Sequence, residues 1–219
     1  IPDRELRSRL EVAARFLHGP AQILADGWGS PLVEDSLTQA LALARERAEP
    51  EVLGQALFKL AVLYEVRGQY ERSGRLMDEA LALPRGELSR QLLVDSLELS
   101  ACSLVHQGKH AEALEHADSA LELSGDEVLP EPVAVFGESP GVSGLVWGSL
   151  ALWHLGRPDS ALERAERAVA ASAIAPRAYA RGMANVNAAI VSQCIRNPAM
   201  ARRWAEAGIE ASGQAGYPY

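Results

Sequence analysis

The sequence predicts an all-α fold built from about five antiparallel helical hairpins. A helical segment, "ALWHLGRPDSALERAERAVAAS" at 151–172, returns at 193–212 as "QCIRNPAMARRWAEAGIEAS". Short breaks between paired helices recur at steps of 40, 40, 48 and 40 residues. These breaks fall at Trp28, Gly68, Gly108, Gly156 and Arg196. The composition agrees, because Ala and Leu dominate while Phe, Ile and Tyr are scarce, which favours helix over strand.

We expect a single repeat domain over residues 1–219, cut from a longer multidomain protein. The hairpins are expected at approximately 3–47, 50–84, 87–124, 139–173 and 175–213, with a loop at 124–139. One hairpin cannot bury its apolar face alone, so neighbouring hairpins stack and share a core. The loop accounts for the 48-residue step. It is either a surface insertion or a functional segment, such as a flap over a groove or a docking site for another domain.

Local chemistry sets the expected helix boundaries. Ser30 is suited to cap the helix that begins at Pro31, since proline is tolerated at the first helical position. The other prolines expected at helix starts are Pro50, Pro140, Pro158, Pro176 and Pro198. Gly68 and Gly108 can adopt the left-handed conformation that ends a helix. The segment "VAVF" at 133–136 is the one short strand candidate.

Small residues at helical spacing mark the faces that we expect to lie between helices. The clearest positions are Ala113, Ala117, Ala120, Ala161, Ala165 and Ala168. A helix that must lie close to two neighbours needs little bulk on the contacting faces. The repetition of such helices along the sequence therefore predicts a stack of closely packed helices.

The spacing resembles the tetratricopeptide repeat (TPR). The segment "LFKLAVLYEVRGQYERSGRLMDEALALP" fits best, with the signature positions Leu57, Leu60, Tyr64, Gly68, Tyr70, Ala80 and Leu81. Ser73 departs from the usual Ala, and the period of 40 exceeds the usual 34. The resemblance implies a right-handed α–α superhelix of TPR-like hairpins.

A narrower resemblance covers nearly the whole chain. The segments that carry it are "GWGSP" at 27–31, "VRG" at 66–68, "SPGV" at 139–142, "LWHLGRPD" at 152–159 and "GYP" at 216–218. In this order they look like the helical-repeat region of bacterial signalling proteins that join an AAA-like ATPase to a class III adenylate or guanylate cyclase. Ser139 replaces the usual Asp of that pattern, and Arg157 replaces the usual aromatic residue. The resemblance implies a bacterial sensor or scaffold region without catalysis of its own.

The search for catalytic and metal motifs supports that expectation. No phosphate-binding GxxxxGK[ST] loop, GxGxxG motif or GxSxG elbow is present. Cys102 and Cys194 are 92 residues apart and lack zinc-site spacing. They read as buried thiols in a reducing cytoplasm. His106, His110 and His116 read as solvated turn residues rather than metal ligands. We therefore expect no catalytic residue, no cofactor and no metal.

The charge and hydropathy restrict the partners. The net charge of −8 argues against nucleic acid and against an acidic membrane surface. No apolar run is long enough for a membrane helix, and no signal peptide is visible. The expected partner is a protein or peptide segment, or another domain of the same chain, with a small effector as an alternative. The expected location is the cytoplasm.

The repeat register predicts which residues face a concave groove, because the first helix of each unit lines it. The candidate partner-binding residues are Lys59, Glu98, His106, Trp147, His154 and Asn187. Trp153 is expected in the core, whereas Trp147 lies on a different face of the same helix; the alternative for the groove is that an adjacent domain fills it or that it binds nothing. Three functions remain open at this point: a scaffold in a signalling ATPase or cyclase, a peptide- or small-molecule-sensing domain of a transcriptional activator, and a helical enzyme using carboxylates such as Glu65 and Glu98. The spacing of those carboxylates gives the enzyme no support.

Overall fold

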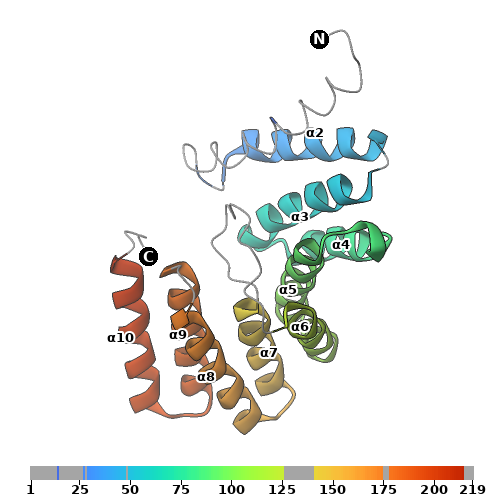
Figure 1. Cartoon of the computed structure of the whole chain (residues 1–219). Helices are drawn as coiled ribbons and strands as arrows, with labels where there is room; N and C mark the ends of the chain where they lie inside the picture. Colours follow the sequence, from blue (N-terminus) through green and yellow to red (C-terminus); the bar gives the residue numbers. More distant parts are fainter. Residues whose placement is uncertain are drawn as a thin grey trace. The chain divides into compact units, whose positions relative to one another are not determined.

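The structure, a computed structural model, describes residues 14, 27, 29–47, 49–125, 141–174 and 178–214. Nine α-helices and one short 3-10 helix lie in these residues, and no strand lies in them (Figure 1). They are α2 (Pro31–Arg47), α3 (Pro50–Val66), α4 (Tyr70–Leu81), η1 (Arg85–Glu87), α5 (Arg90–His106), α6 (His110–Ser124), α7 (Val142–His154), α8 (Pro158–Ile174), α9 (Ala178–Cys194) and α10 (Pro198–Gln214). The predicted all-α fold class is confirmed.

Several sequence predictions fall outside the described residues. These are most of the first helix of the 3–47 hairpin, nearly all of the 124–139 loop, the "VAVF" segment, the helix start at Pro176 and the closing "GYP". The hairpin boundaries as a set therefore stay predictions.

The chain divides into two compact units, Ile1–Ser103 and Leu104–Tyr219. In the first unit, α3 packs against both α2 and α4. An apolar stripe on α2 is buried, and it comprises Leu37, Ala40, Leu41 and Ala44. Leu57 and Leu63 of α3 are fully buried, as is Met77 of α4. Three helices thus share one apolar interior.

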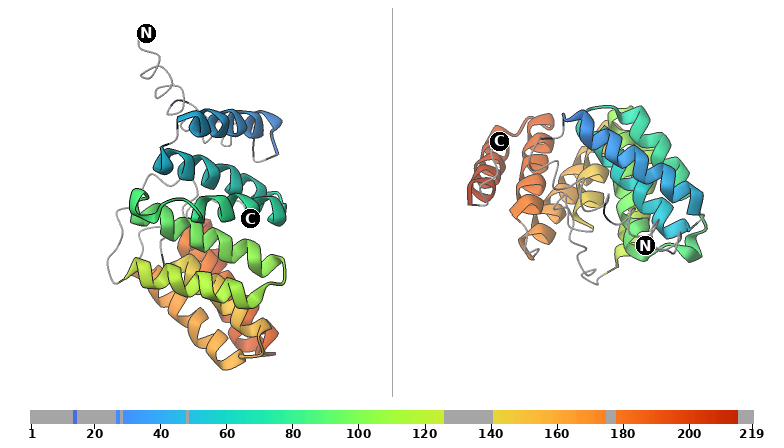
Figure 2. Two further views of the ribbon diagram at one scale, coloured as in Figure 1. Left: turned by 90° about the vertical axis from the view of Figure 1, so that its right-hand side faces the viewer. Right: turned by 90° about the horizontal axis from the view of Figure 1, so that it is seen from above.

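In the second unit, α7 packs against α6 and α8, and α9 packs against α8, α7 and α10. Figures 1 and 2 show α9 and α10 side by side. The alanines predicted to lie between helices, from Ala113 to Ala168, all have no exposed surface. Ala161 and Ala165 of α8 contact Ala188 and Val191 of α9 in one core cluster. Small side chains therefore allow the close helix approach that the sequence predicts.

The same turn closes the four breaks that the structure describes in full. Gly68, Gly108 and Gly156 have φ angles of +69°, +77° and +75°, and Arg196 takes the same conformation with φ of +61°. After each of them, the next backbone N–H bonds back to a carbonyl five residues earlier at 2.8–2.9 Å. This is the Schellman arrangement that ends a helix. The predicted left-handed conformation of Gly68 and Gly108 is confirmed.

A buried arginine fixes the spacing between α7 and α8. The Arg164 guanidinium donates to the Asp118 carboxylate at 2.5 Å and to the Gly144 carbonyl at 3.1 Å. It lies directly against Gly148, where a Cβ atom would come within 2.3 Å of the guanidinium carbon. The absence of a side chain at Gly148 makes room for the Arg164 guanidinium. In that position the guanidinium makes its hydrogen bonds to Asp118 and Gly144.

We predict that Gly148→Ala destabilises the protein by about 1–3 kcal/mol, because the methyl group displaces the guanidinium from its two hydrogen bonds. Urea unfolding followed by circular dichroism measures the change. Gly213→Ala is the matched control, since a Cβ atom added at that glycine would have no neighbour within 4 Å, and it should not destabilise. Equal stability of the two variants would contradict the role assigned to Gly148.

Candidate functional site

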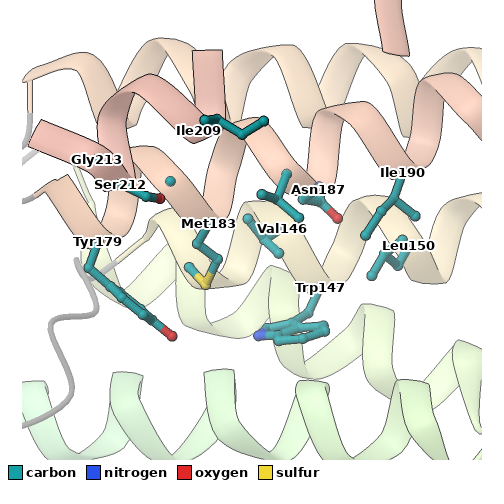
Figure 3. A pocket seen from close by; sticks show the side chains of 13 residues that line it. Val146, Trp147, Leu150, Tyr179, Met183, Asn187, Ile190, Ile209, Ser212 and Gly213 are labelled. Atoms are coloured by element: carbon teal, nitrogen blue, oxygen red, sulfur yellow. The ribbon is translucent and has the colours of Figure 1, made fainter. Parts of the chain in front are cut away.

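An apolar pocket lies between α7, α9 and α10 of the second unit, with a volume of about 560 Å³ (Figure 3). Its lining residues are Val146, Trp147, Leu150, Tyr179, Gly182, Met183, Val186, Asn187, Ile190, Gly208, Ile209, Ser212 and Gly213. None of these described residues is Asp, Glu, His, Lys, Arg or Cys. The lining suits the binding of apolar groups rather than acid–base chemistry.

Three large aliphatic side chains at the pocket are exposed to solvent. Val186 is 49% exposed, Ile190 is 42% exposed and Ile209 is 73% exposed. Single exposed aliphatic residues are ordinary, but a group of them on one concave surface marks an interaction site. Figure 3 shows Ile190 and Ile209 on the ribbons of neighbouring helices, on either side of Asn187.

Glycines bring α9 and α10 together at the pocket wall. A Cβ atom on Gly182 would lie 2.9 Å from the Ser212 Oγ atom. A Cβ atom on Gly208 would lie 3.3 Å from a methyl carbon of Val186. Both helices therefore approach more closely than larger residues would allow, and their outer aliphatic side chains stand around the opening.

A polar group is buried in the wall of this apolar surface. The Asn187 side chain is 3% exposed, and its Nδ2 atom donates to the Ser149 Oγ atom at 2.8 Å. The Ser149 hydroxyl donates in turn to the Val146 carbonyl at 2.7 Å. The Asn187 Oδ1 atom has no hydrogen-bond partner among the described residues. A buried acceptor without a partner is costly, and this oxygen is closed to solvent as well.

The structure brings three of the predicted groove residues together. Trp147 and Asn187 both line the pocket. The exposed His106 ring meets Trp147 edge to face, with 5.5 Å between the ring centroids. The half-buried Trp147 packs against the core and also lines the pocket.

His154 lies elsewhere on the second unit. Its exposed ring stacks on His110 with 4.1 Å between centroids and contacts Trp153 edge to face. Burial lowers the pKa of His110, and the neighbouring His154 lowers it further. His110 therefore favours the neutral state, in which its ring stacks on His154 without charge repulsion.

Lys59 and Glu98 belong to the first unit. Lys59 is half-buried on α3, where burial lowers its pKa and the Asp95 carboxylate opposes that change. Glu98 is only 2% exposed on α5. Its carboxylate is therefore within the packed interior of that unit. The partner-binding roles of both residues stay predictions.

Sequence reasoning does not single out several pocket residues: Tyr179, Gly182, Met183, Val186 and Ser212. The small–aliphatic pair Gly208-Ile209 does stand at the repeat position of Ala80-Leu81 and Ala168-Val169 in the earlier hairpins. The signal that could have found the site was that pair together with Ile190, because isoleucine is scarce in this chain and three of its six isoleucines fall in the last hairpin.

Comparison with known proteins gives structural matches only. No family model and no curated protein matches the sequence. The TPR-like repeats of a putative kinesin light chain of Podosopora anserina align with 17% identity and a TM-score of 0.63, covering 96% of this chain and 98% of theirs. BtubC (BKLC) of P. vanneervenii aligns with 14% identity and a TM-score of 0.67, covering 99% and 85%. MamA aligns with 13% identity and a TM-score of 0.52, covering 84% and 94%.

The fold is that of the TPR-like helical repeats. At this level of identity the likeness concerns the fold alone. Among the described helices, none combines the length and apolar character that crossing a bilayer requires.

A half-buried carboxylate in the first unit gives a pH prediction. Burial raises the pKa of Asp95 to about 6, although a 2.7 Å hydrogen bond from Gln91 and the charge of Lys59 both lower it. An unfolded aspartate has a pKa near 3.9. The folded chain therefore holds more protons than the unfolded chain between these values, and this group's contribution to stability is lost as the pH rises from about 4 to about 6.

We predict that Asp95→Asn removes this loss. The free energy of unfolding of the variant, relative to the wild type, should increase as the pH rises through that window and then level off. Urea unfolding at pH 4, 5, 6 and 7 measures it. The exposed Asp78 provides the control Asp78→Asn, which should show no such rise. A difference independent of pH would show that Asp95 is not the titrating group.

Proposed function

We propose that this chain is a noncatalytic, TPR-like recognition scaffold. The pocket between α7, α9 and α10 binds an apolar segment of a partner protein or of another domain of the same chain. The proposed setting is a bacterial signalling ATPase or cyclase, or a transcriptional regulator. The support for that setting is the order of the sequence segments from "GWGSP" to "LWHLGRPD".

The observation that carries the binding proposal is the set of exposed aliphatic side chains at the pocket. Val186, Ile190 and Ile209 leave apolar surface in contact with water, and its removal from water on binding is favourable at about 25 cal/mol per Å². The lining residues supply no ionisable side chain other than Tyr179. Shape and apolar burial are thus the means of recognition, which supports a scaffold over an enzyme.

A small effector is the second candidate occupant. The pocket volume of about 560 Å³ lies within the range of small-molecule sites. His106 lies beside Trp147 and is placed to extend contacts in either case. We assign Lys59 and His154 to further contacts of the scaffold, as the repeat register suggests, whereas Glu98 at 2% exposure is closed to a partner in this structure.

We predict that peptides selected from a random displayed library on the full chain bind through this pocket. Ile209→Glu should weaken them at least about tenfold, because a buried aliphatic side chain contributes roughly 1.5–3 kcal/mol. Isothermal titration calorimetry measures the affinity. Leu155→Glu is the matched control, since Leu155 is also an exposed aliphatic residue of this unit but does not line the pocket.

The Leu155→Glu variant should bind within about twofold of the wild type, since roughly 0.4 kcal/mol is the limit of a bystander surface change. Peptides that bind equally well to the Ile209→Glu variant would remove the pocket from the proposal. The coding sequence on both sides of residues 1–219 checks the setting: a cyclase, ATPase or DNA-binding module there supports it, and a metabolic enzyme contradicts it.

A further inference from the structure

The repeat register relates the exposed aliphatic group to covered positions one hairpin earlier. With a step of 40 residues, Val146 of α7 is the repeat equivalent of Val186 of α9, and Leu150 of α7 is the equivalent of Ile190 of α9. By the same step, Val169 of α8 is the repeat equivalent of Ile209 of α10. The two hairpins therefore carry aliphatic residues at the same positions on equivalent faces.

In the α7–α8 hairpin this face is covered by the helix that follows. Val146 is 2% exposed and lies in a core cluster with Ala184 of α9. Val169 and Met183 pack against that cluster. In the α9–α10 hairpin the equivalent Val186 is 49% exposed and Ile209 is 73% exposed. The difference is the presence of a following helix in one case and its absence among the described residues in the other.

In the first unit, too, a following helix covers the equivalent face of a hairpin. The position on α3 equivalent to Ile190 is Val62, three breaks earlier, and its side chain is 8% exposed. There α5 packs on α3: a Cβ on Gly54 would lie 2.8 Å from a Leu92 methyl carbon, and the Cys102 thiol donates to the Glu65 carboxylate at 2.8 Å. In both of these hairpins, a following helix is thus the occupant of this face.

We infer that the outer face of the α9–α10 hairpin, defined by Val186, Ile190 and Ile209, is a seat for an α-helix of a partner, docked as α9 docks on α7 and α8. This inference rests on the proposed function and specifies its occupant. The partner helix presents a stripe of small residues, as α9 does with Ala180, Ala184 and Ala188, which all have no exposed surface. A stripe with a spacing of four lets two helices interlock closely.

The occupant is a helix rather than an extended peptide because the exposed side chains follow helical geometry on both elements. Val186 and Ile190 are one turn apart on α9, and Ile209 stands beside them from α10, so the seat is a groove between two helix surfaces. Apolar grooves of this kind accept the apolar face of an amphipathic helix. An extended chain would leave its backbone groups without partners on these aliphatic walls.

The chain itself supplies the probe. A synthetic peptide with the sequence of residues 178–194, carrying Cys194→Ser and blocked ends, reproduces the helix that covers the equivalent face. A hydrocarbon staple joining positions 186 and 190 of the peptide holds it helical, since a free peptide of this length is marginally stable. Those two positions are exposed on α9, so the staple lies away from the Ala180, Ala184 and Ala188 stripe.

Methyl NMR of the full chain with labelled isoleucine measures binding and its place. The isoleucines are Ile1, Ile23, Ile174, Ile190, Ile195 and Ile209. We expect the stapled peptide to shift the signals of Ile190 and Ile209 at one saturable site and to leave Ile195 in place. Ile209→Glu should weaken binding at least about tenfold, given the value of one buried aliphatic side chain, and Leu155→Glu should not.

A second peptide tests the small-residue stripe. The same stapled peptide with Ala184→Leu and Ala188→Leu remains helical, but its larger side chains prevent close approach. It should bind at least about tenfold more weakly, as expected for a poorly packed contact. Equal binding of the two peptides would overturn the inference, because general apolar contact would then suffice.

Other results would also overturn it. Dilution of the free protein that moves the Ile209 signal would assign the face to a second copy of this chain. A small apolar compound that shifts Ile209, with no shift from the helix, would assign it to an effector. If the selected library peptides depend on Ile209 but the stapled helix does not bind, the proposed function stands and the helical seat fails.

Discussion

Close approach between helices through side chains no larger than alanine is the constraint on which the rest of the structure depends. Ala161, Ala165 and Ala168 of α8 have no exposed surface, and neither do Ala184 and Ala188 of α9. Such residues bury little area each, so stability comes from repeating the contact along a stack. A group of large aliphatic side chains gathered at one pocket, such as Val186, Ile190 and Ile209, then stands apart from this pattern.

The same constraint explains why the turns are uniform even where the sequence is not. Antiparallel helices that lie this close need a tight reversal, and Gly68, Gly108 and Gly156 supply it through left-handed backbone. Arg196 adopts that conformation without being glycine, at a cost of roughly 1–2 kcal/mol. The back-bond from Asn197 to the Ser192 carbonyl is 2.9 Å long, equal within 0.1 Å to its counterparts. Packing therefore imposes the turn on the local sequence.

Local chemistry is sufficient to predict most of the fold and only part of the site. Helix starts at Pro31 and Pro158 and the buried alanine stripes depend on residues near in sequence, so periodicity reveals them. Exposure depends on whether a neighbouring element is present, which periodicity does not encode. Hence the repeat register places Trp147 and Asn187 in a groove, gives no sign of Val186, and assigns Glu98 to a groove although that residue is 2% exposed.

The helical seat and the small-molecule pocket share their walls, and this sharing has a functional consequence. Val186 and Ile209 belong to both, so the proposed docked helix would cover part of the pocket lining. An effector that fills the pocket removes the same aliphatic surface from the helix. The two occupants therefore exclude each other, and each lowers the affinity for the other by the same factor. A scaffold with such a surface could release a partner helix on binding an effector without any rearrangement of its own stack.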